Sequence, residues 1–175
     1  MKIERGFTLM ELLVTLAIAG VLLTMAVPSF KTTITNNRQV AQINELLGAI
    51  MYARSEAITE NKSTILCASS DETSCNTNWS QGWIVYVPSG STITPLRVHS
   101  ALDGGNTLKS DTAIGTTITF KSNGTSSTTG TGTFTLCDSR GSSYARALSL
   151  SSTGIARASQ TVGKEIDGTT ALSCP

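Results

Sequence analysis

The chain has 175 residues, enough for one membrane-spanning segment and one modest soluble domain. Lys and Arg together number 13, and Asp and Glu number 12, so the charges nearly cancel. This balance argues against a generally basic nucleic-acid-binding protein and against an acidic tail. Any binding of nucleic acid would therefore depend on a local cluster of basic residues.

An apolar run extends from Phe7 to Val27, and Glu11 is the only ionisable side chain in it. A helix of this length spans roughly 31 Å at about 1.5 Å per residue, which matches the hydrocarbon thickness of a bilayer. A carboxylate inside such a segment costs about 2.5 kcal/mol or more unless it finds a partner. We therefore expect Glu11 to have a function.

Three interpretations fit the first thirty residues. An ordinary secretory signal, cleaved after the apolar run, is disfavoured by Glu11 and by the lack of a clear A-x-A site. A plain single-pass anchor would keep Lys2 and Arg5 in the cytoplasm. The third interpretation is a prepilin that is cut between Gly6 and Phe7 and retains its apolar segment.

A short basic leader ending at Gly6, then Phe7, then a lone Glu11 resembles the class III signal of type IV pilins and pseudopilins. The resemblance implies that a prepilin peptidase cuts before Phe7 on the cytoplasmic side and that the new Phe7 nitrogen is methylated. In a filament, the Phe7 ammonium can lie beside Glu11 of a neighbouring subunit and offset the buried carboxylate.

Pro28 follows the apolar run and is expected to kink the helix without ending it, because an apolar pattern resumes at once. The three- and four-residue spacing predicts an amphipathic half-helix whose apolar stripe needs a cover. The stripe contains Phe30, Ile34, Val40, Ile43, Leu46, Leu47, Ile50, Met51, Ala57 and Ile58. We expect one helix from about Phe7 to Ile58, ending near residues 60–62.

The composition then changes to Ser, Thr and Gly with short β-branched runs, which predicts strands separated by turns. The expected strands are Ser63–Ala68, Trp83–Val87, Leu96–Ala101, Thr116–Lys121, Gly132–Cys137 and Ala145–Ser151, with Ile155–Ser159 as a candidate for the last. Residues 122–133 are expected to form a long hairpin loop, with a flexible linker as the alternative.

The pattern predicts an α+β fold in which a mostly antiparallel sheet lays its apolar face on the amphipathic half of the long helix. This is the arrangement of the type IV pilin fold. Three parts are expected: a leader peptide at residues 1–6, a transmembrane and filament-core half-helix at 7–29, and a globular domain at 30–175 that includes the amphipathic half.

The four cysteines are Cys67, Cys75, Cys137 and Cys174. An even number after a membrane segment predicts two disulfides in an oxidising compartment, and buried thiols are the alternative. Three pairings are possible, and proximity in sequence favours Cys67–Cys75 with Cys137–Cys174. No C-x-x-C pair is present and His99 is the only histidine, so we expect no metal site and no cofactor. His99 is expected to be a partly exposed bystander.

Several later segments resemble the GspH/FimT branch of minor pilins and pseudopilins: Ala53–Ile58, Ile65–Ser69, Trp79–Val85, Ile118–Phe120 with Asn123-Gly124, Phe134–Asp138 and Ser152–Gly154. Trp79 and Trp83 are interpreted as core residues. The branch contains components of the type IV pilus and of the type II secretion pseudopilus. Some pilus members are implicated in DNA uptake through a C-terminal Gly-Arg-x-Arg motif. The matching positions here read Gly154-Ile155-Ala156-Arg157, so Arg157 fits and Ile155 does not.

Basic residues outnumber acidic ones between residues 121 and 164, where Lys121, Arg140, Arg146, Arg157 and Lys164 stand against Asp138. If these side chains cluster, they can hold DNA phosphates without reading sequence. The alternative is a solvated face with scattered charges. Arg140, Arg146, Arg157 and Lys164 are the candidate DNA-binding residues.

No nucleophile or phosphate-loop motif of an enzyme is found in the sequence. We expect a minor pilin of a type IV pilus, with sequence-independent binding of double-stranded DNA as an added role. The alternative is a type II secretion pseudopilin without DNA binding. The expected location is the inner membrane, with a periplasmic globular domain, and then the pilus at the cell surface. The expected partners are prepilin peptidase and other pilins in a filament.

Overall fold

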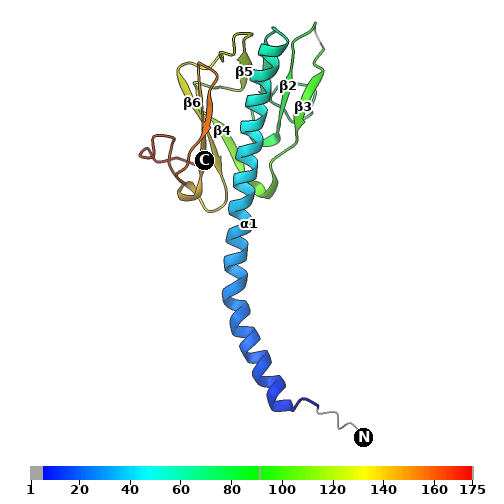
Figure 1. Ribbon diagram of the computed structural model, residues 1–175, viewed down its shortest axis with the longest axis vertical. Coiled ribbons are helices and arrows are strands. Elements are labelled where there is room, and N and C mark those ends of the chain that lie inside the picture. The colour runs from blue at the N-terminus through cyan, green and yellow to red at the C-terminus, as the bar shows by residue number, and fades with distance from the viewer. Residues whose placement is uncertain (1–5, 91, 175) are drawn as a thin grey trace. The chain divides into compact units, whose positions relative to one another are not determined.

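The computed structural model describes residues 6–90 and 92–174 (Figure 1). Within these ranges lie one α-helix and eight strands. They are α1 (Leu9–Thr59), β1 (Thr64–Ala68), β2 (Trp83–Tyr86), β3 (Pro95–His99), β4 (Thr107–Ser110), β5 (Thr117–Phe120), β6 (Thr131–Cys137), β7 (Arg146–Ser151) and β8 (Ala156–Ala158). Short 3-10 turns occur at Trp79–Gln81, Asp103–Gly105 and Ser142–Tyr144. Most of the predicted leader, residues 1–5, lies outside the described residues.

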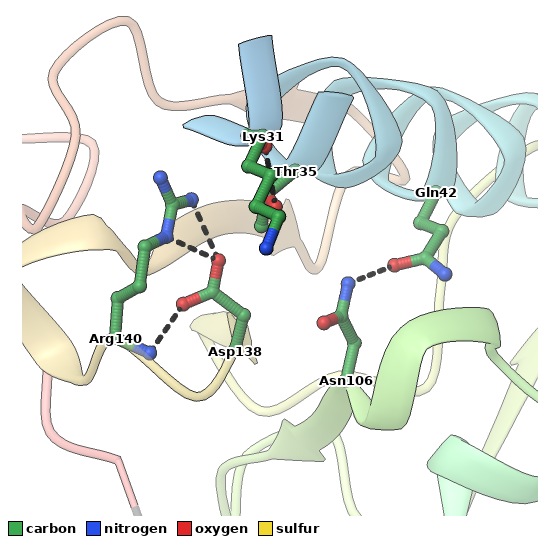
Figure 2. A network of polar contacts seen from close by, with 6 residues as sticks. All are labelled: Lys31, Thr35, Gln42, Asn106, Asp138 and Arg140. Carbon is green, nitrogen blue, oxygen red and sulfur yellow. Dashed lines mark hydrogen bonds and ion pairs between the residues drawn. The ribbon is translucent and has the colours of Figure 1, made fainter. Parts of the chain in front are cut away.

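The chain divides into two compact units between Asn37 and Arg38, although α1 is continuous in sequence across this point. In the first unit, α1 continues through Pro28 without a break. Thr hydroxyls donate to carbonyls one turn earlier, as Thr35 does to Lys31 over 3.0 Å (Figure 2). By length and composition, α1 is the one described helix that is long and apolar enough to cross a membrane.

In the second unit, the core is built by the part of α1 after Arg38 and by one face of each of the two sheets, whose strands lie beside the helix (Figure 1). Residues at three- and four-residue spacing on α1 are buried, namely Ile43, Leu46, Ile50, Ala53 and Ala57. Trp79 and Trp83 are also buried in this core, as the sequence predicted. Burying such side chains is the main favourable term in folding this unit.

The C-terminal end of α1 is set by Asn61, which adopts a left-handed conformation with φ 50°. The Lys62 N–H donates to the Ala57 carbonyl over 3.2 Å, and the Asn61 N–H donates to the Ile58 carbonyl over 3.4 Å. These two bonds form a Schellman motif, which satisfies carbonyls that the end of the helix would leave unpaired. The predicted end at residues 60–62 is therefore confirmed within a residue or two.

The strands form two four-stranded antiparallel sheets, in the orders β3-β2-β1-β5 and β4-β6-β7-β8. The α+β class, with a long helix packed on antiparallel strands, is confirmed, and the strands are divided between two sheets. Strand β4 was not predicted, because Leu108 is its only apolar residue. The segment 121–130 is not a hairpin loop, since it connects β5 of one sheet to β6 of the other.

The expected apolar stripe of α1 is only partly covered. Ile43, Leu46 and Ile50 are buried, whereas Met51 and Ile58 are 61% and 49% exposed. Phe30, Ile34 and Val40 are exposed as well. Within the second unit, the sheets thus cover a narrower strip of the helix than the spacing of apolar residues suggested.

Two disulfides join Cys67 to Cys75 and Cys137 to Cys174, which is the pairing that sequence proximity favoured. The first closes a loop at the end of β1. The second ties the C-terminal segment to the end of β6, where Leu172 packs with Ala145 and Ala147.

Candidate assembly and nucleic-acid-binding residues

Glu11 lies in the first turn of α1. The Thr8 hydroxyl caps this helix, since it accepts the backbone N–H of Glu11 over 3.2 Å. Thr8-x-x-Glu11 has the spacing of a capping box, so Glu11 occupies the third helical position. A carboxylate there is favoured by the helix dipole, which adds a local role to the assembly role expected from the sequence. Gly6, Phe7 and Glu11 are all exposed in the isolated chain, so a neighbour could reach them.

Arg140 lies in the turn after β6 and is held by Asp138. Its Nε and Nη2 donate to Asp138 Oδ2 over 2.9 and 2.6 Å, and its backbone N–H donates to Oδ1 over 2.8 Å (Figure 2). The Asp138 side chain is only 2% exposed. The guanidinium of Arg140 also lies 4.3 Å from the centre of the Tyr144 ring. The charge of Arg140 is therefore largely engaged within the chain.

Arg146 begins β7, where it is paired with Leu136, and it shares a sheet face with Leu148. Leu136 and Leu148 both belong to the core cluster that contains α1. Arg146 is half-buried at the end of this face, and among the described residues its buried Nε has no hydrogen-bond partner. Burial, and then the positive charge of Arg140, lower the pKa of the Arg146 guanidinium. The two arginines are therefore close enough to repel each other.

Arg157 lies on the opposite face of the same sheet. It pairs with Ser149, which is three positions from Arg146 on β7, and side chains alternate between faces along a strand. Arg157 is exposed. Lys164 lies beyond the sheet, and its ammonium donates to the Thr169 carbonyl over 3.0 Å. The four candidate DNA-binding residues therefore do not form one surface.

Gly154, the first residue of the motif-like segment, lies in the turn between β7 and β8. Its φ is 76°, and a Cβ there would lie 2.1 Å from the Gly124 carbonyl oxygen. Arg54 of α1 joins the same two turns, since its Nε donates to the Gly124 carbonyl over 3.0 Å and its Nη2 reaches the Thr153 carbonyl at 3.5 Å. Nothing in the sequence pointed to Arg54, because its partners lie 70 and 99 residues away.

His99 is not the bystander that the sequence suggested. Its ring stacks on Trp83 with the centroids 3.9 Å apart, and its Nε2 lies 2.9 Å from Glu45 Oε2 on α1. His99 thus links the edge strand β3 to the helix. Among the described residues, no group of three or more His, Cys, Asp or Glu side chains is placed to hold a metal ion.

A capped apolar helix that continues into a core covered by antiparallel sheets defines a protein of the type IV pilin class. Residues 1–27 match the prokaryotic N-terminal methylation motif. Residues 42–154 match the family described as type II transport protein GspH. The chain belongs to this family of pilins and pseudopilins, whose members are structural proteins.

Solved structures and curated relatives agree with this assignment. A crystal structure of the type IV minor pilin FimU of Pseudomonas aeruginosa is 28% identical and covers 71% of this chain and 95% of that chain, with a TM-score of 0.57. A second crystal form of FimU gives 26% identity, 77% and 98% coverage, and a TM-score of 0.59. The minor pseudopilin EpsH of the Vibrio cholerae type 2 secretion system is 9% identical, covers 69% and 95%, and has a TM-score of 0.51, so it shares the fold.

Two curated fimbrial proteins of Pseudomonas aeruginosa are each 29% identical over 104 residues. This alignment covers 59% of the chain and 65% of each relative, so the chain matches somewhat less than two thirds of their length.

Proposed function

We propose that this chain is a minor pilin that assembles into a type IV pilus. The observation that carries the proposal is the similarity to the minor pilin FimU, at 28% identity over 95% of its crystallised chain. The pseudopilin EpsH matches over the same share of its length at 9% identity. A type II secretion pseudopilin is the competing function, and it is supported by the description of the matching family.

Assembly would begin in the inner membrane, where α1 anchors the precursor and the domain from Arg38 onward lies in the periplasm. Prepilin peptidase would cut before Phe7 and create an α-ammonium, which is then methylated. That ammonium would lie beside Glu11 of a neighbouring subunit in the filament, so each buried charge gains a partner. The two disulfides fit an oxidising compartment such as the periplasm.

The experiment uses one deletion strain, in which pilus-dependent motility and type II secretion are measured side by side. We expect motility to fail while secretion continues. Sheared pili from the complemented strain should contain a peptide that starts at Phe7 and is one methyl heavier. Loss of secretion with normal motility would favour the pseudopilin, and a mature start near Pro28 would contradict prepilin processing.

Arg157 supports a second function, weak contact with the backbone of duplex DNA. It is the basic position that fits the motif of the GspH/FimT branch, and it is exposed on β8. Binding should be similar for unrelated duplexes and should fall steeply between about 50 and 200 mM salt. Arg157→Ala should lower the salt slope by about one unit, whereas Arg140→Ala should change it less because Asp138 already holds that charge. If no duplex is shifted at low salt by the wild-type chain, this second function is excluded.

A further inference from the structure

We propose that the Cys67–Cys75 bridge is a site of thiol–disulfide exchange, at which an external thiol of neutral or positive charge attacks Cys75 and Cys67 leaves. The assignment of one attacked and one leaving sulfur goes beyond assembly into a filament and does not depend on it. It follows from the burial of the two cysteines, from the hydrogen bonds of the loop between them and from the charge of that loop.

The two sulfurs of this bridge differ in how far a second molecule can reach them. Cys67 lies in the middle of its sheet, where it pairs with Ile84 of β2 and Thr117 of β5, and its exposed fraction is 0%. Cys75 lies in the loop after β1 and is exposed. Exchange needs a thiolate to reach the sulfur that it attacks. Of the two, Cys75 offers that access, so Cys67 is the leaving sulfur.

The exchange balances with a thiol as the co-reactant. The external thiolate forms a bond to Cys75 Sγ, the bond between the two cysteine sulfurs breaks, and Cys67 leaves with the electron pair and takes a proton from solvent. A second thiolate then attacks the added sulfur and releases Cys75. Two external thiols are thereby oxidised to a disulfide, and the bridge is reduced. In reverse, the same steps close the bridge when an oxidised partner meets the reduced chain.

The loop between the cysteines holds its shape through contacts that do not involve the bridge. The Asn76 N–H donates to the Ala68 carbonyl over 2.7 Å, and these two residues directly follow the cysteines. Asp71 accepts the Ser74 hydroxyl over 2.6 Å and the N–H groups of Ser74 and Thr73 over 2.8 and 3.0 Å. These bonds, led by the Ser74 hydroxyl, lower the pKa of the Asp71 carboxyl, so it stays ionised. The sulfurs therefore remain close after exchange, and the bridge opens and closes without unfolding the domain.

The second bridge, Cys137–Cys174, is less open to attack. Cys137 is 3% exposed and Cys174 is half-buried. Leu172 and Ala145 pack beside these cysteines in a small apolar cluster. An attacking thiol therefore meets no sulfur here that is as accessible as that of Cys75, and the two bridges should differ in their rates of exchange.

The charge of the loop selects the kind of thiol. Asp71 and Glu72 lie within four residues of Cys75, and no Lys or Arg occurs between Lys62 and Arg97. The Tyr86 hydroxyl, 3.8 Å from Cys75 Sγ, is a neutral group, and it is the donor because a bridged sulfur carries no proton. The carboxylates repel an anionic thiol and attract a cationic one at separations inside the Debye length, which is about 10 Å at 0.1 M salt.

The first test measures which cysteine is attacked. The full-length chain in detergent is exposed to cysteamine, quenched with acid at successive times and alkylated, and peptide mass spectrometry locates the cysteamine adduct. We expect the first adduct on Cys75, with Cys137 and Cys174 reacting at least about tenfold more slowly. A first adduct on any other cysteine, or opening of both bridges at the same rate, would overturn the proposal.

The second test measures the selection by charge. Rates per thiolate are compared for cysteamine, which is cationic, and mercaptopropionate, which is anionic. Cysteamine should open the bridge about tenfold faster at low salt, and the ratio should shrink at about 0.5 M salt. Glu72→Gln should lower the ratio, whereas the matched control Glu60→Gln should not, because Glu60 precedes the far end of β1. Equal rates for the two thiols would overturn the charge selection.

The source of the thiol is identified by trapping. The oxidised chain is mixed with a thioredoxin-fold oxidoreductase that retains a single active-site cysteine, so that a mixed disulfide cannot resolve. A mixed disulfide at Cys75 identifies a protein thiol as the partner, and an adduct with cysteamine alone identifies a small thiol. If neither forms an adduct at Cys75 while the domain stays folded, the exchange site is refuted.

Discussion

The two disulfides should differ in how much they stabilise the domain, and their loop lengths set the difference. They span 8 and 37 residues along the chain. In the chain-entropy model, closing these loops contributes about 2.5 and about 3.8 kcal/mol at 25 °C. Opening the Cys137–Cys174 bridge should therefore cost roughly 1.3 kcal/mol more than opening the Cys67–Cys75 bridge.

The substitutions are chosen at the more accessible cysteine of each pair. Cys75 is exposed and Cys174 is half-buried, whereas Cys67 and Cys137 are buried. Cys75→Ser and Cys174→Ser therefore leave a buried thiol in place, which packs as a small apolar group. Neither change buries a new hydroxyl deep in the core. The difference in stability between the two variants should therefore come mainly from the loop-closure entropy of the two bridges.

The assay is urea unfolding of a fragment that begins at Lys31, with intact-mass analysis after alkylation to count free thiols. With a slope of about 2 kcal/mol per molar urea, the Cys174→Ser midpoint should lie roughly 0.7 M below the Cys75→Ser midpoint. The wild-type fragment should show no free thiol. A Cys75→Ser variant that is as unstable as Cys174→Ser, or more so, would refute the loop-length reasoning.

Two further predictions concern single residues. Glu11→Ala should leave the level of the chain in the membrane unchanged, because it makes the segment more apolar. It should reduce the incorporation of the chain into sheared pili. Equal incorporation of the variant and the wild type would contradict an assembly role for Glu11. Gly154→Ala should destabilise the domain by about 2–4 kcal/mol, since its Cβ meets the Gly124 carbonyl in a left-handed turn. Gly90→Ala is the control, because Gly90 has a similar φ of 69° with no atom within 4 Å, and urea unfolding should show only about 1 kcal/mol there.

The helix and most strands follow from local patterns, and what was missed depends on contacts distant in sequence. The apolar run, the three- and four-residue spacing and the β-branched runs are each read within a short window. Strand β4 gives no such signal, because Leu108 alone of its residues is buried. It becomes a strand by pairing with β6, and its outer edge is covered by the Ser80 hydroxyl, which accepts the Leu108 N–H over 2.9 Å.

The face on which a basic residue lies is equally invisible in the sequence. Arg146 and Arg157 are separated by a turn whose exact position decides the register of β7 and β8. A shift of one residue would move Arg157 to the other face. The sequence therefore shows an excess of basic residues between 121 and 164, but it does not show whether their side chains lie on the same surface.

The positions of the basic residues between 121 and 164 indicate whether DNA or another protein contacts this part of the chain. Arg140 and Arg146 lie close together, but Asp138 holds the first and the core face of the sheet half-covers the second. Arg157 lies on the opposite face from Arg146, so the local excess of charge does not become a continuous path for a phosphate backbone. Ile155 removes a further basic position and adds apolar surface beside Met51 and Ile58. The engagement of Arg140 and Arg146 within the chain and the apolar side chain of Ile155 both favour contact with protein over contact with DNA. Each leaves fewer solvated cations for a phosphate backbone.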